Sequence, residues 1–194
     1  MNIFQDTIIM SFRNTSNSFG SVAKFFHWVI SPLVILMLAF GFFMEDVPED
    51  YKGLVYNTHK LVGLTILFLM VLRLLWALTN PKPVQPRTTA PLLRLSAQLV
   101  HYALYLFVIV MAAAGWVGAV AGGRPPHLGD FMFSLPIEQD KGLAETAFTI
   151  HGYVAWVLIA LVTVHVLAAL YHHLVKKDEV LSRMLPGGKV KRFY

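Results

Sequence analysis

Four long apolar stretches limit what this chain can fold into more than any other feature of its sequence. They cover roughly residues 26–44, 54–78, 98–121 and 147–174. A helix needs about 20 residues to cross the hydrocarbon core of a bilayer, and each stretch is about that long or longer. Helix is the expected state of such segments because every backbone polar group must be satisfied internally in lipid. The sequence therefore predicts an all-α membrane protein, a four-transmembrane-helix bundle forming one membrane domain over residues 1–194.

The composition agrees with a bilayer protein and excludes several kinds of site. Charged residues make up 14 % of the chain, whereas a soluble domain carries about 25 %. The chain has no cysteine, which excludes disulfides, thiolate metal sites, iron–sulfur clusters and a cysteine nucleophile. Nucleic acid is not an expected partner, because the basic residues follow the membrane topology and no nucleic-acid-binding motif accompanies them.

Charge predicts the orientation of the bundle. If both termini are cytoplasmic, the inner side holds twelve of the sixteen basic residues, and the basic tail after Lys176 can also contact anionic lipid. These twelve are Arg13, Lys24, Arg73, Lys82, Arg87, Arg94, Lys176, Lys177, Arg183, Lys189, Lys191 and Arg192. The positive-inside rule then places both termini in the cytoplasm. The N-terminal 25 residues lack the features of a signal peptide and are interpreted as a short cytoplasmic lead-in.

Histidines inside the predicted spans are the main evidence for function, because ligating side chains within a bilayer are costly. His151 and His165 lie fourteen residues apart in the fourth stretch. At about 1.5 Å and about 100° per residue, they are roughly 21 Å apart along one helix and roughly 40° apart around it. This spacing is far too long for one metal ion and suits two haems stacked across the membrane.

Each of these histidines needs a partner at the same depth. His59 lies near the outer end of the second stretch, level with His151, so His59 and His151 form the predicted outer pair. For the inner pair with His165, both His27 in the first stretch and His101 in the third have a suitable depth, and spacing leaves the two alternatives open. Haem iron that is ligated by two histidines has no open coordination position, which suits electron transfer.

Two basic residues accompany these histidines. Arg73 follows His59 by fourteen residues, the same offset that separates His151 from His165. Arg73 is therefore expected at the depth of the inner haem, either on a haem propionate or extended toward the cytoplasmic surface. Lys60, beside His59, is a candidate for an outer propionate or an anionic substrate.

Short motifs along almost the whole chain, from about Lys24 to Pro186, resemble the bacterial cytochrome b561 family. They are F-H-W, N-T-H-K-x-x-G, V-L-R-L-L-W, Q-L-V-H-Y-x-L-Y, H-V-L-A-A-L-Y-H-H and, most distinctive, K-K-D-x-V-L-x-R-M-L-P. The resemblance implies two b haems ligated by His27, His59, His151 and His165. It implies that His101 does not ligate iron and instead supports a ligand. It also implies a multi-pass protein of the bacterial inner membrane that transfers electrons to quinone.

The resemblance implies in addition that superoxide is a possible donor at the outer face and ubiquinone the acceptor, so that the chain would act as an oxidoreductase. The expected outer side is net negative by four, with four basic and eight acidic residues, whereas superoxide would favour a positive entrance. Two alternatives therefore stay open: a periplasmic redox donor other than superoxide, or a local funnel that the basic residues of the outer side form for superoxide. These basic residues are Lys52, Lys60, Arg124 and Lys141. Alternative functions are a haem-bearing membrane anchor for a dehydrogenase or hydrogenase, and a histidine-lined metal-ion transporter.

Overall fold

The computed structural model describes residues 12–84 and 91–187 and is mostly helical in them. Its long helices are α1 (Ser21–Phe43), α2 (Glu49–Thr79), α3 (Pro91–Ala121) and α4 (Lys141–Tyr171), the last continued by the π-helical turn η1 (His172–Lys176). All four are long and apolar enough to cross a membrane. The predicted four-helix membrane fold is therefore confirmed.

The helices extend beyond the predicted stretches at several ends. The second predicted stretch begins at residue 54, but α2 already begins at Glu49. Acidic Glu49 and Asp50 occupy the first turn of α2, where they interact favourably with the positive end of the helix dipole. Asp140 caps α4, since its Oδ1 accepts hydrogen bonds from the backbone N–H groups of Gly142 and Leu143 at 2.8 and 3.1 Å.

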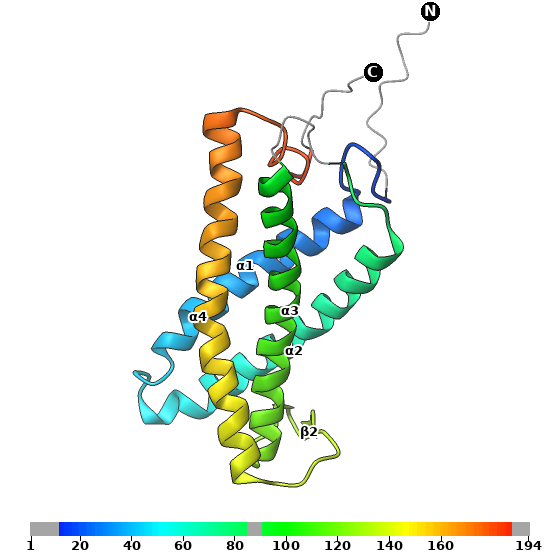
Figure 1. The fold of residues 1–194 in the computed structure, drawn as a ribbon. Coiled ribbons are helices and arrows are strands. Elements are labelled where there is room, and N and C mark those ends of the chain that lie inside the picture. Colours follow the sequence, from blue (N-terminus) through cyan, green and yellow to red (C-terminus); the bar gives the residue numbers. More distant parts are fainter. Residues whose placement is uncertain (1–11, 85–90, 188–194) are drawn as a thin grey trace, which may run out of the picture.

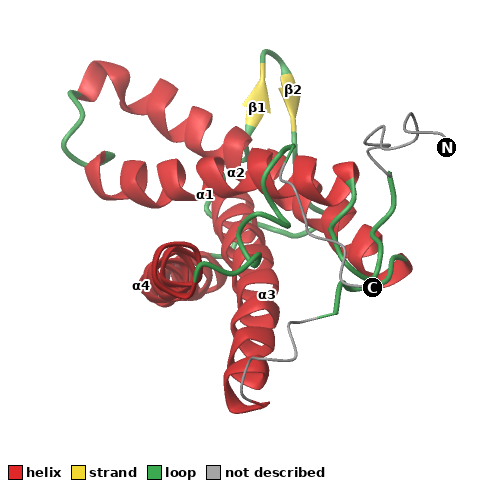
Figure 2. Ribbon diagram, turned by 90° about the horizontal axis from the view of Figure 1, so that it is seen from above, coloured by secondary structure: helices red, strands yellow, loops and turns green. Residues whose placement is uncertain are grey.

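The helices form two antiparallel pairs that cross obliquely (Figures 1 and 2). Helices α3 and α4 run side by side, while α1 and α2 form the second pair. The described residues begin at Phe12 and stop at Gly187 at the same end of the bundle, called here the terminal end. The opposite end, called the hairpin end, carries two short antiparallel strands, β1 (His127–Leu128) and β2 (Phe131–Met132).

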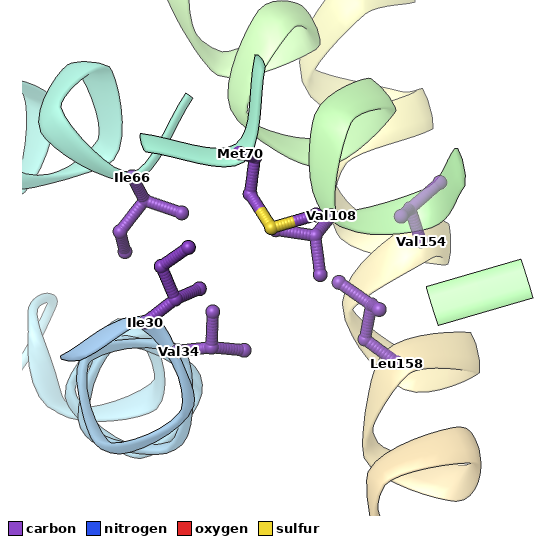
Figure 3. Close-up of a cluster of buried hydrophobic side chains, with 7 residues drawn as sticks. All are labelled: Ile30, Val34, Ile66, Met70, Val108, Val154 and Leu158. Atoms are coloured by element: carbon purple, nitrogen blue, oxygen red, sulfur yellow. The ribbon is translucent and has the colours of Figure 1, made fainter. Parts of the chain in front are cut away.

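The buried core lies halfway along the bundle. Side chains from all four helices meet there (Figure 3): Ile30, Val34, Ile66, Met70, Val108, Val154 and Leu158. Leu158 is the most buried of them, with 1 % of its surface exposed. It is seven residues from His151 and seven from His165, so the core separates the hairpin end of α4 from the terminal end by about 10 Å in each direction.

Many other apolar side chains of the helices are exposed, as expected when lipid replaces water around the bundle. Leu36, Phe68 and Leu167 are examples, each with 60 % or more of its surface exposed. The first eleven residues of the lead-in, and Arg87, Lys189, Lys191 and Arg192 of the charge argument, lie outside the described residues. The charge-based orientation thus stays a prediction.

Candidate functional site

The first histidine pair lies at the hairpin end. The rings of His59 on α2 and His151 on α4 have centroids 6.2 Å apart and planes inclined by 68°. Two imidazoles that ligate one metal ion from opposite sides have centroids about 6 Å apart, because a metal–nitrogen bond is about 2 Å and the nitrogen lies about 1 Å from the ring centre. The pair therefore has the spacing that a bis-histidine site requires.

The surroundings of this pair fix the ring of His151. Its Nδ1 lies 2.8 Å from the carbonyl oxygen of Met111 on α3, which can only accept a hydrogen bond. Nδ1 therefore carries the proton and donates it, and Nε2 keeps its lone pair for a metal. Gly115, one turn further along α3, leaves the room for this ring, since a Cβ there would lie 2.9 Å from His151 Cε1 and Nδ1.

The partner ring, His59, is packed differently. Its Nδ1 is buried and has no hydrogen-bond partner among the described residues, and the Phe40 ring stacks against it at 6.3 Å. Two hollows adjoin the imidazole. One, of about 50 Å³, is also lined by Gly63, Met111 and His151; the other, of about 260 Å³, is lined by Phe40 and further apolar residues of α1 and α2. Apolar walls around imidazole nitrogens match the donor set and burial that haem needs.

The second pair lies at the terminal end. His27 on α1 and His165 on α4 have ring centroids 6.2 Å apart with planes at 70°. The Nδ1 of His27 faces two polar groups, the Ser31 hydroxyl at 3.4 Å and Arg73 Nη2 at 3.2 Å. The two pairs thus have the same ring spacing at opposite ends of the core.

His101 also reaches the terminal-end site. Its ring lies 5.3 Å from the ring of His165, centroid to centroid, with planes at 74°. This distance is shorter than two ligands on opposite sides of one metal ion allow, whereas the His27–His165 distance fits. The geometry therefore favours His27 as the partner of His165 and places His101 against the His165 ring.

The two predicted basic residues take well-defined positions. Arg73 lies at the terminal end, as its spacing predicts, with its guanidinium 5.2 Å from the centre of the Tyr105 ring in addition to its contact with His27. No carboxylate among the described residues forms an ion pair with Arg73. At the hairpin end, Lys60 Nζ donates to the backbone oxygen of Arg124 at 2.9 Å.

Several contributors to the site could not be located from the sequence. The carbonyl of Met111 and the hydroxyl of Ser31 are supplied by residues without a distinctive motif. Asn57, within N-T-H-K, holds the β1 backbone by two hydrogen bonds, donating from Nδ2 to His127 O and accepting at Oδ1 from His127 N, at 2.8 and 3.0 Å. The glycines of α3, Gly115, Gly118 and Gly122, are a sequence feature that could have pointed to a close approach at this helix, but close helix packing explains them equally well.

Comparison of the amino-acid sequence with known proteins identifies a matching family. A family model described as prokaryotic cytochrome b561 matches residues 18–187. The chain is 32 % identical to cytochrome b561 homolog 2 of Escherichia coli (strain K12) over 180 residues, which cover 91 % of the chain and 95 % of that relative. It is also 28 % identical to a probable superoxide oxidase CybB of Yersinia pestis over 160 residues, 82 % of the chain and 91 % of that relative. Cytochrome b562 of Cereibacter sphaeroides is 27 % identical over 165 residues, 82 % of the chain and 89 % of that relative.

Proposed function

Since the chain belongs to the prokaryotic cytochrome b561 family, we propose that it is a di-haem electron carrier linking a donor at the outer face to membrane quinone. Membership of this family makes it a multi-pass bacterial membrane protein that carries haem b and takes part in electron transport. The number of haems, their ligands, the donor and the quinone are the proposed parts.

The observation that carries the proposal is the equal spacing of two histidine pairs across one apolar core. His59 and His151 would hold the haem at the hairpin end, and His27 and His165 the haem at the terminal end. When bound, haem iron supplies a one-electron couple whose potential depends on its ligands and their surroundings. The chain contributes by fixing the four imidazoles and by excluding water from the core between them.

Arg73 is proposed to bind a propionate of the terminal-end haem. A partly buried guanidinium that forms no ion pair with a carboxylate of the described residues favours an anion that can accept two parallel hydrogen bonds. With Arg73 engaged in this way, the Nδ1–H of His27 has the Ser31 hydroxyl, 3.4 Å away, as its acceptor. His27 then has the same proton arrangement that Met111 imposes on His151.

At the outer face, superoxide is the proposed donor. Two superoxide anions would each lose one electron and leave as dioxygen, and a quinone would take up two electrons and two protons to become quinol. The Y. pestis relative is named a probable superoxide oxidase. Of the cations on that side, Lys52 pairs with Glu49 at 2.8 Å. Lys60, the residue after His59, lies beside Arg124, to whose backbone oxygen its Nζ donates at 2.9 Å. An anion therefore has a local positive site on a face that is net negative.

The proposed orientation follows from charge. The terminal end, with most of the basic residues, would face the cytoplasm, and the hairpin end would face the periplasm of a bacterium with an inner membrane. Lipid surrounds the bundle in this arrangement, and quinone would exchange with the site through it. Ubiquinone is the quinone proposed.

Membranes that contain the protein should reduce ubiquinone when superoxide is generated on their outer side. A double variant, His59→Ala with His151→Ala, is the matched control because it removes only the hairpin-end ligands. A wild-type rate no higher than that of this control would refute superoxide oxidation. If a soluble dehydrogenase or hydrogenase copurifies instead, the alternative function of a haem-bearing anchor is favoured.

A further inference from the structure

The most distinctive motif of the chain, K-K-D-x-V-L-x-R-M-L-P, has no place in the electron-transfer proposal. It forms the turn after α4 and a short segment, Asp178–Leu185, called here the terminal cap. The chain reverses at Lys177, whose φ of 52° is left-handed. The Nδ1 of His172 donates a hydrogen bond to Asp178 Oδ2, and Asp178 Oδ1 accepts from the N–H of Val180 at 3.0 Å. These contacts direct the cap back over the terminal end of the bundle.

Two long-range hydrogen bonds attach the terminal cap to other parts of the chain. Arg183 Nη1 donates to the backbone oxygen of Val84, in the segment after α2, at 2.8 Å. The indole N–H of Trp28 on α1 donates to the backbone oxygen of Met184 at 2.9 Å. Val84 in turn donates its N–H to Ser16 O at 2.8 Å. The cap therefore joins α4, α1 and the chain after α2 at one end.

The bond to Trp28 lies next to a proposed haem ligand. His27 precedes Trp28, and the two rings meet edge to face with centroids 5.4 Å apart. The ring of His27 also lies 6.2 Å from the ring of His165, centroid to centroid. The cap begins thirteen residues after His165 and returns to the residue after His27, so it closes a loop between the two helices that supply this pair.

We propose that the terminal cap is a positioning element for the terminal-end histidine pair, acting through the Trp28–Met184 hydrogen bond. With its indole anchored, Trp28 holds one face of the His27 ring and sets its angle to His165. The ring angle and imidazole environment influence the redox potential of a ligated haem. The inference rests on the proposed ligation by His27 and His165, and it gives the C-terminal motif a role in tuning one haem from outside the site.

The test compares two tryptophans that make the same type of bond at opposite ends. Trp28→Phe keeps an aromatic edge against His27 and removes only the N–H donor. Trp116→Phe is the matched control, because Trp116 Nε1 donates to Phe133 O at 2.8 Å near the hairpin end. Arg183→Gln is a second, independent variant that loosens the cap without changing α1, because it removes the bond to Val84 and the 3.8 Å ion pair with Glu179 inside the cap. The two haem signals are first assigned with His27→Met and His59→Met.

Three quantities are measured in detergent-purified, haem-loaded protein. Two describe each haem: its electron paramagnetic resonance signal and its midpoint potential. The third is the hydrogen-exchange rate of the cap amides, which can be measured without relying on a haem signal. Trp28→Phe and Arg183→Gln should each speed exchange in Asp178–Leu185 about fivefold, the change expected for one hydrogen bond of about 1 kcal/mol. Both should also shift the signal and potential of the terminal-end haem alone, while Trp116→Phe should leave that haem unchanged.

The inference is overturned if the cap exchanges faster in either variant while the terminal-end haem keeps its signal and potential. It is equally overturned if exchange in the cap does not change, since the cap would then not depend on these bonds. If Trp28→Phe does not fold, Arg183→Gln decides between these results. A wild-type protein with a single haem, at the hairpin end, would instead contradict the di-haem proposal, and it is recognised separately from haem content per chain.

Discussion

Gly115 offers a sharp test of the hairpin-end site, because a single methyl group there meets the ring of a proposed ligand. In Gly115→Ala the new Cβ would lie 2.9 Å from both Cε1 and Nδ1 of His151, and ordinary contact begins at 3.4 Å. The ring must therefore withdraw by 3.4 − 2.9 = 0.5 Å. Metal sites tolerate deviations of only about 0.2 Å in ligand distance. The same movement disturbs the hydrogen bond from Nδ1 to Met111 O.

The expected decrease in haem affinity follows from the overpacking and from the weakened hydrogen bond. Overpacking by one methyl group costs about 1–3 kcal/mol, and a weakened hydrogen bond costs about 1 kcal/mol. The sum, about 2–4 kcal/mol, lowers haem affinity at this site by a factor between about 30 and 700, since every 1.4 kcal/mol is tenfold. The terminal-end site, on the other side of the core, should keep its haem.

The assay is a haem titration of the purified protein, followed by reduced-minus-oxidised spectra and a redox titration that resolves the two haems. Gly152→Ala is the matched control, because it is the same change next to His151 and its Cβ would meet nothing within 4 Å. Gly115→Ala should lose the hairpin-end component, and Gly152→Ala should keep both. Two haems with unaltered affinity and potential in Gly115→Ala would refute the placement of this ligand ring.

Three further substitutions test other parts of the account. His27→Ala should abolish the terminal-end haem while His101→Ala retains it with a shifted potential; the reverse result in haem content per chain would make His101 the ligand. Leu158→Ala should lower the free energy of unfolding by about 2–5 kcal/mol because this core side chain is 1 % exposed, whereas Leu167→Ala on the outer surface should change it little; equal effects in detergent unfolding would contradict the assigned core. Lys60→Gln should slow haem reduction by superoxide and weaken its dependence on ionic strength, and an unchanged rate in stopped-flow measurements would exclude Lys60 from the proposed anion site.

The fold was predictable because bilayer length and backbone satisfaction leave few alternatives. Each predicted stretch overlaps one of the four helices, and the errors are confined to the ends, where each helix begins before its predicted stretch. Glu49 and Asp50 illustrate this, because a charged turn at a helix N-terminus looks like a loop when only hydropathy is considered. The β1–β2 hairpin was not predicted, since its two-residue strands carry almost no pattern.

The approach of the histidines to one another was predictable in part, for a related reason. Helical spacing alone puts His151 and His165 on one face at two depths, and depth alone pairs His59 with His151. Spacing alone did not distinguish His27 from His101, and only the resemblance to a family favoured His27. Both rings lie near His165, and it is the lateral arrangement of α1 and α3 that sets their distances from it at 6.2 Å and 5.3 Å. The partners of ring nitrogens, such as the Met111 carbonyl, were equally hidden, since every residue has a backbone oxygen and packing selects one of them.

Haem content per chain is the measurement that tests the central claim most directly. Protein purified in mild detergent is examined by oxidised and reduced spectra, with and without carbon monoxide, and haem is quantified as the pyridine complex. The account predicts two b haems per chain, both low-spin and insensitive to carbon monoxide because histidines occupy both axial positions. One haem per chain, or a band that shifts with carbon monoxide, would contradict the paired-histidine account.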